Sequence, residues 1–197
     1  MNYSIYAEST PNPEVMKFVS NRMLADKSLE ILNASEAKEI PIANELFKLP
    51  FVKSVFISSN FVSVTKTATI EWQDIALQLR MYITDFLNSI EIINHTEYIS
   101  TDIKEKSESV KEVIIEEKRE FEGSEKEIAE LLDEYIRPAV EGDGGAITLH
   151  SFVDGIVSVT LSGACNGCPS STVTLKQGIE SLLKQKMGEK IKEVVAK

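Results

Sequence analysis

Two cysteines, Cys165 and Cys168, stand three positions apart in the segment GACNGCPSS and are the only thiols of this 197-residue chain. Thiols at this spacing can form a disulfide, bind a metal ion or an iron–sulfur cluster, or act as the attacking and resolving groups of a redox enzyme. The cysteine segment is therefore where the sequence most clearly carries chemistry.

The residues around the two thiols predict a tight loop that runs into a helix. Pro169 suits a first helical turn, and the hydroxyls of Ser170 and Ser171 can accept hydrogen bonds from the amides that a helix start leaves free. Amide donors and the helix dipole stabilise a thiolate over a thiol. Gly163 and Gly167 would let the backbone approach a bulky cluster closely.

Three uses of the thiol pair stay open on the residues alone. The first is structural: the two cysteines could be small buried hydrophobic residues or ligands of a zinc ion. Burial is not expected beside Asn and Gly, and two cysteines fall short of the about four ligands that zinc takes. The second is a thioredoxin-type oxidoreductase, although the preceding βαβ unit is replaced by a helix and a hairpin. The third is an iron–sulfur cluster whose four thiolates come from two chains around a twofold axis.

The amino-acid composition disfavours some classes of binding partner. The formal net charge is −10, from 31 acidic and 21 basic residues, which disfavours contact with nucleic acid or anionic lipid. No stretch approaches the roughly 18 apolar residues of a membrane span, and the start MNYSIYAEST lacks the features of a signal peptide. We expect no nucleic-acid and no membrane partner, and a cytoplasmic location or the mature form of an imported protein.

Glycine and charge divide the chain into two parts. All nine glycines lie at or after Gly123, and residues 98–123 are rich in Glu and Lys but poor in apolar side chains. The sequence predicts an α+β fold with two small α+β domains, residues 1–97 and 124–197. The charged linker 98–123 between them is expected to be partly helical or disordered.

The first domain mixes strand and helix signals. Two strands are predicted around the turn TPNP, in SIYAEST and EVMKFVSNRML, and a short helix is predicted in PIANELFKL. A hairpin is predicted from VKSVFIS and FVSVTK, with its turn at Ser59 and Asn60, because Asn tolerates positive φ. WQDIALQLRMYITDFLNSI predicts an amphipathic helix. Its apolar positions are Ile75, Leu79, Tyr82, Ile83, Phe86, Leu87 and Ile90.

The second domain predicts helix, hairpin, cysteine loop and helix. Ser124 and Glu127 predict a capping box before a helix whose apolar face is Ile128, Leu131, Leu132, Tyr135, Ile136 and Val140. EGDGG ends that helix, and AITLHSFV and IVSVTL form a hairpin around Asp154 and Gly155. The final helix, with Leu175, Ile179, Leu182, Leu183 and Met187 in register, stops at Gly188.

The cysteine segment has a family resemblance. GACNGCPSSTVTLKQGIESLL closely resembles the signature of the NifU-like C-terminal domain, and IRPAVEGDGG resembles the opening of that domain. AESTPNPEVMKF resembles the hallmark of the N-terminal domain of Nfu-type proteins. Together the two resemblances cover nearly the whole chain apart from the linker.

The resemblance implies a carrier or scaffold that is not an enzyme. It implies a [4Fe-4S] cluster held between two protomers through Cys165 and Cys168, with a homodimer forming on cluster binding. It also implies partners: apo iron–sulfur client proteins that receive the cluster and an upstream cluster donor. The chain lacks the cysteine-rich scaffold and ferredoxin-like domains of full-length NifU, so we expect transfer rather than assembly.

Other polar residues are assigned structural uses. The family often has an acidic residue where this chain has Ala146, so Asp143, Gly144 and Gly145 are interpreted as turn residues. His150, His95 and Trp72 are interpreted as surface or packing residues. Arg137 is expected to pair with a nearby carboxylate.

Limited proteolysis tests the predicted division into domains. We expect cleavage within residues 98–123 and release of two folded fragments, because that segment has too few apolar residues to resist a protease. Mass spectrometry of the fragments locates the cuts. Uniform resistance across the segment would indicate a packed helix that joins the domains into one body.

Overall fold

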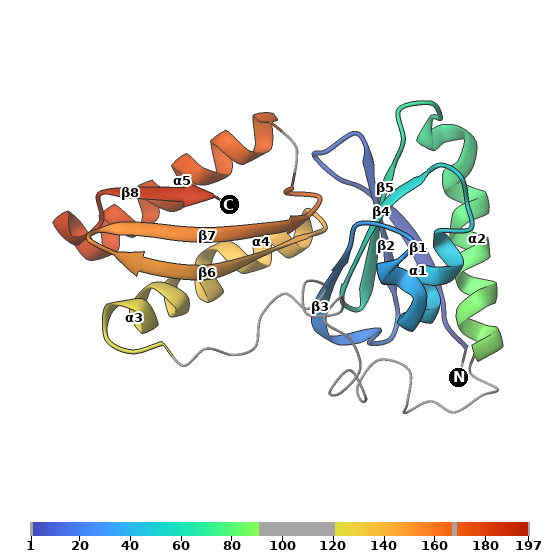
Figure 1. Ribbon diagram of the computed structural model, residues 1–197, viewed down its shortest axis with the longest axis horizontal. Coiled ribbons are helices and arrows are strands. Elements are labelled where there is room, and N and C mark those ends of the chain that lie inside the picture. The colour runs from blue at the N-terminus through green and yellow to red at the C-terminus, as the bar shows by residue number, and fades with distance from the viewer. Residues whose placement is uncertain (1, 91–120, 167–168, 197) are drawn as a thin grey trace. The chain divides into compact units, whose positions relative to one another are not determined.

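The computed structural model describes residues 2–90, 121–166 and 169–196, which fall in two compact units. Each unit combines helices with a sheet, which confirms the predicted α+β class (Figure 1). The boundaries of the predicted domains and linker stay predictions, because residues 91–120, including His95, lie outside the described residues. No helix among the described residues is long and apolar enough to cross a membrane.

The first unit is built on an antiparallel sheet. Its described strands are β1 (Ile5–Ser9), β2 (Val15–Ser20), β3 (Ala25–Ile31), β4 (Val52–Ser59) and β5 (Phe61–Lys66), in the spatial order β1-β2-β5-β4-β3. The predicted strands around TPNP and the predicted hairpin are confirmed, whereas β3 was not predicted. In that hairpin Ser59 has the positive φ, 49°, which sequence reasoning assigned to Asn60.

The TPNP turn is fixed by its own hydrogen bonds. The Thr10 hydroxyl lies 2.9 Å from the carbonyl of Asn12 and 3.0 Å from that of Val15. The amide of Glu14 donates to the side chain of Asn12, which is only 6% exposed. This turn therefore satisfies buried polar groups while it joins β1 to β2.

Helices pack the core of the first unit against the sheet. They are the 3-10 helix η1 (Glu36–Glu39), α1 (Pro41–Leu46) and α2 (Trp72–Ile90), and the bounds of α2 are those predicted. Buried side chains from α2 and the strands form one cluster that includes Phe18, Val55, Ile57, Val62, Val64, Leu79, Ile83 and Leu87. Trp72 packs edge-on against Phe18 at 6.3 Å between ring centroids, which confirms its structural use.

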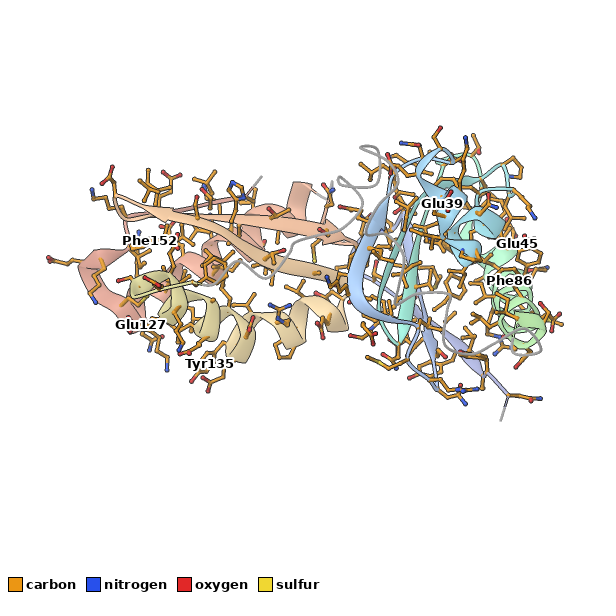
Figure 2. The ribbon with its side chains drawn as sticks, turned by 60° about the horizontal axis from the view of Figure 1, so that its bottom comes forward. Glu39, Glu45, Phe86, Glu127, Tyr135 and Phe152 are labelled. Carbon is orange, nitrogen blue, oxygen red and sulfur yellow. The ribbon has the colours of Figure 1, made fainter. Side chains whose placement is uncertain are left out.

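A polar contact joins α1 to α2 beside this core. The hydroxyl of Tyr82 and the ammonium of Lys48 both donate to the carboxylate of Glu45, next to Phe86 (Figure 2). The hydrogen bond to Glu45 is the main reason that the pKa of Tyr82 is raised to about 12. The pKa of Glu45 is lowered, first by Lys48 and then by Tyr82.

We predict that Tyr82→Phe lowers the free energy of unfolding by about 1 kcal/mol, because one hydrogen bond is lost. The pKa of Tyr82 is higher in the folded state than in the unfolded chain, where it is about 10. The hydrogen bond therefore contributes its full stabilisation at pH values below about 10. It disappears as the pH rises through about 12. Chemical denaturation at pH 7 measures it.

The matched control is Tyr6→Phe at an exposed position, which should change stability by less than about 0.5 kcal/mol. Equal effects of the two substitutions would show that the bond to Glu45 does not stabilise the unit.

The second unit has three described strands with helices packed on them. The elements are α3 (Ser124–Leu131), the π-helix η3 (Leu132–Ile136), α4 (Arg137–Gly142), β6 (Gly145–Val153), β7 (Ile156–Gly163), α5 (Pro169–Met187), the 3-10 helix η4 (Gly188–Lys190) and β8 (Glu193–Ala196). β6 and β7 are antiparallel, as predicted, with positive φ at Asp154 and Gly155. β8, which was not predicted, pairs in parallel with β7.

The predicted capping box is wrong. Ser124 is the first residue of α3 and makes no side-chain cap, while Gly123 is the N-cap with φ 56°. The carbonyl of Gly123 accepts the amide of Glu127 at 3.3 Å. Glycine allows this positive φ, so the helix begins on the residue that was expected to cap it.

The predicted position of Tyr135 on the apolar face of this helix is also wrong. Arg137 donates its amide to Leu132, five residues back, because Pro138 cannot donate to Glu134 and the helix widens by one residue. This extra residue turns Tyr135 outward, where it is 43% exposed and lies on the side away from the strands (Figure 2). The ammonium of Lys186 covers the ring at 4.6 Å from its centroid.

Candidate functional site

Cys165 lies on a loop between a strand and a helix, as predicted. β7 ends at Gly163, which has φ 64°, and α5 begins at Pro169. The amide of Asn166 donates to the carbonyl of Gly163 at 3.0 Å, so the loop turns tightly. Gly167 and Cys168 lie outside the described residues, and the assignment of Cys165 and Cys168 as ligands stays a prediction.

The side chain of Cys165 is buried, contrary to the expectation from its Asn and Gly neighbours. It is only 5% exposed and belongs to the core cluster that contains Leu161 and Ile179. The space for it comes from Gly145: a Cβ built on that glycine would stand 2.8 Å from the Cys165 sulfur. The thiol therefore sits against a bare stretch of the β6 backbone.

The segment Asp143-Gly144-Gly145 has two parts. Asp143 and Gly144 form the predicted turn, with amides that donate to Ala139 at 3.0 Å and Glu141 at 3.1 Å. Gly145 is not a turn residue but the first residue of β6, paired with Gly163 on β7. The difference arises because Gly144, with φ 82°, already reverses the chain.

Ser162 is a second feature of the site that the sequence analysis missed. It is fully buried on β7 beside Ala146, one residue before the end of the strand that leads to Cys165. Within the described part of the chain, its hydroxyl has no hydrogen-bond partner. A buried hydroxyl without a partner is uncommon, because desolvation is not offset by a bond.

Ion pairs lie on the helices of this unit. The guanidinium of Arg137 donates to Asp133 at 2.9 Å, which confirms its structural assignment, and His150 is exposed on β6. Glu180 on α5 accepts Lys184 at 2.6 Å and the Val194 amide of β8 at 3.1 Å. These two bonds, that of Lys184 first, lower the pKa of Glu180.

The helix that follows the loop supplies electrostatic support. α5 is 19 residues long, and the free amides at its start carry a partial positive charge. Lys176 on α5 bonds Glu193 on β8 at 3.1 Å, which ties the helix to the sheet. The start of α5 therefore favours negative charge near it.

Comparison with known families matches both parts of the chain. Residues 5–90 match the family described as "Scaffold protein Nfu/NifU N terminal", and residues 128–195 match "NifU-like domain". The second match contains Gly145, Ser162 and Cys165. Both parts of the resemblance expected from the sequence are confirmed.

Curated relatives match across both parts. The human protein described as "NFU1 iron-sulfur cluster scaffold homolog, mitochondrial" is 35% identical over 181 residues, covering 91% of this chain and 66% of its own length. The Drosophila willistoni protein of the same description is 33% identical and covered over 58% of its length. The chain therefore spans less than two thirds of these relatives.

A solved structure is also similar to part of the chain. It is the solution NMR structure of a NifU-like protein from Saccharomyces cerevisiae, at 27% identity and a TM-score of 0.43. The similarity covers 51% of this chain and 87% of that one.

We predict that Ser162→Ala leaves the apo-protein folded and stabilises it by about 1 kcal/mol, because a buried hydroxyl without a partner is removed. Denaturant unfolding measures the change. Ser158→Ala, on the same strand but half-buried, is the matched control and should be neutral. A loss of stability specific to Ser162→Ala would mean that its hydroxyl is bonded in the folded protein.

Proposed function

Since this chain belongs to the Nfu/NifU family, with an Nfu N-terminal domain followed by a NifU-like domain, we propose that it is an iron–sulfur cluster carrier or scaffold rather than an enzyme. It binds a [4Fe-4S] cluster between two protomers and transfers it to apo-proteins. The descriptions of the relatives as iron-sulfur cluster scaffold homologs support this function.

The observation that carries the proposal is the position of Cys165 within the match to the NifU-like domain. It lies on a loop between β7 and the amino-terminal end of the long helix α5, where free amides favour a thiolate. Cys168, three residues on, is the proposed second ligand. Both cysteines supply thiolates, the ligand type that iron–sulfur clusters take.

The number of thiols determines the proposed assembly. A cubane cluster takes four thiolates and each chain has two cysteines, so two protomers form a homodimer around one cluster. In transfer, a client thiolate displaces one ligand thiolate from iron and the remaining ligands follow stepwise. This exchange changes the ligands of the cluster and needs no change in its oxidation state.

The proposed partners are proteins. An upstream donor loads the cluster, and apo iron–sulfur clients receive it; the net charge of −10 disfavours nucleic acid and anionic membranes. The N-terminal domain docks on a donor or client, and residues 98–123 link it to the cluster domain and raise the effective concentration. A cytoplasmic location stays our prediction, while the relatives are described as mitochondrial.

Anaerobic cluster reconstitution tests the proposal. We expect about one [4Fe-4S] cluster per two chains and conversion of monomer to dimer on loading, because each chain supplies half of the ligands. Cys165→Ser and Cys168→Ser should abolish binding equally, since either change removes two of the four thiolates and a hydroxyl is a poor ligand for iron. Iron and sulfide content, visible absorption and native mass measure these outcomes.

The same variants separate a carrier from a thiol–disulfide enzyme. In an enzyme the first cysteine attacks and the second resolves, so Cys168→Ser alone would trap a mixed disulfide through Cys165. Non-reducing electrophoresis detects such adducts. Adducts specific to Cys168→Ser, retained cluster in either variant, or a stable cluster-bound monomer without an added thiol would contradict the carrier.

A further inference from the structure

Gly145 has no side chain, and the space that this leaves is occupied by the side chain of Cys165. A Cβ at this position would stand 2.8 Å from the sulfur of Cys165, 3.2 Å from its Cβ and 2.6 Å from the carbonyl oxygen of Ser162. Carbon atoms do not pack against sulfur or oxygen at 2.8 Å or less, so any side chain at 145 would displace the thiol or spread the strands. The absence of a Cβ is what allows Cys165 to lie where it does.

We propose that Gly145 is the positioning residue for Cys165 and holds this thiol in a closed, buried seat in the apo-protein, from which Cys165 must move before the cluster binds. The proposal deepens the proposed function, on which its meaning rests. It is carried by the contact with Gly145 and by the burial of Cys165, which is 5% exposed.

A seated Cys165 leaves little room for a cluster. Cys165 belongs to the buried cluster of its own chain that includes Leu161 and Ile179, and its sulfur lies against the β6 backbone at Gly145. A cluster shared between two chains must meet both at their surfaces, and iron must approach the sulfur directly. Burial of the Cys165 thiol and its binding to iron at a protein surface exclude each other, so the seated and cluster-bound positions of Cys165 are different states.

The loop is built to leave its seat without unfolding the sheet. Its amide at Ala164 bonds the carbonyl of Gly144 at 3.2 Å, and the two chain segments meet at glycines with positive φ, Gly144 at 82° and Gly163 at 64°. Loss of this bond, together with the other contacts of the segment around Cys165, is a local opening beside a sheet that stays paired from Ala146 onward. The seat therefore protects the thiol in the apo-protein and can still release it.

The test follows the reactivity of Cys165 in apo-protein. Cys168→Ser leaves Cys165 as the only thiol in the chain, and alkylation by N-ethylmaleimide is followed by intact mass. We expect the folded protein to react at least about tenfold more slowly than the same protein in denaturing urea, since reaction waits for local opening. Adding Gly145→Ala should accelerate alkylation several-fold, because the new methyl group displaces the sulfur.

Gly142→Ala in the same single-thiol protein is the matched control. It makes the same chemical change three residues away, where a Cβ meets nothing within 4 Å, and should leave the alkylation rate unchanged. Circular dichroism verifies that each variant is folded. Equal rates for the Gly145 and Gly142 variants, or a folded protein that reacts as fast as the unfolded one, would overturn the proposal.

A second measurement applies if Gly145→Ala does not fold. The Cys168→Ser protein with Gly145 intact is alkylated at several urea concentrations below its unfolding midpoint. A slow rate that depends on urea much less steeply than global unfolding supports release by loop opening. A rate that follows global unfolding throughout would refute it.

The outcome is distinguishable from failure of the proposed function, because no step uses iron. If wild-type protein fails to take up a cluster while Cys165 behaves as seated, the carrier function fails and the seat stands. If the cluster binds but Gly145→Ala does not change alkylation, the seat fails and the carrier function stands.

Discussion

The approach of the Cys165 thiol to the backbone of Gly145 is the contact on which the local arrangement of the NifU-like domain depends. It joins three elements: the start of β6, the end of β7 and the loop that leads to α5. The register that pairs Gly145 with Gly163 puts the two glycines opposite each other and leaves a place for the sulfur. The helix before β6 must end at Gly142 and the chain must turn at Gly144 for this register to form.

At this contact, the burial that favours packing of the core conflicts with the exposure that the proposed function needs. Burial of Cys165 contributes to the core, whereas the cluster ligand that we propose it to be must reach iron at a surface. The hydroxyl of Ser162 adds an unfavourable term, because within the described residues it is buried without a hydrogen bond. Such local conflicts concentrate at functional sites, where the surrounding structure holds groups in positions that they would not adopt alone. The stable β6–β7 pairing and α5 supply that support.

Sequence patterns predicted the elements whose signals are local and strong. The apolar stripe of α2, the Asp154-Gly155 hairpin and a cysteine on a strand-to-helix loop each depend on neighbouring residues. The strands β3 and β8 were missed because ADKSLEI is largely polar and EVVA is only four residues long, so pairing with other strands determines them. The π-helix was missed because its extra residue breaks the assumed 3.6-residue period.

The sequence predicts a chemistry for the candidate site, which stays a prediction, but it did not predict the geometry of the site. Spacing left cluster binding as one of three uses of the thiol pair, and the family resemblance favoured it, since thiol type and helix start are readable from adjacent residues. The seat on Gly145 joins positions twenty residues apart through strand register, and no local pattern records such an approach. EGDGG did signal a backbone that needs glycine, but Gly144 explains the turn alone. A second glycine beyond what a turn requires is therefore the sequence signal for a close contact, and here its partner is the proposed ligand.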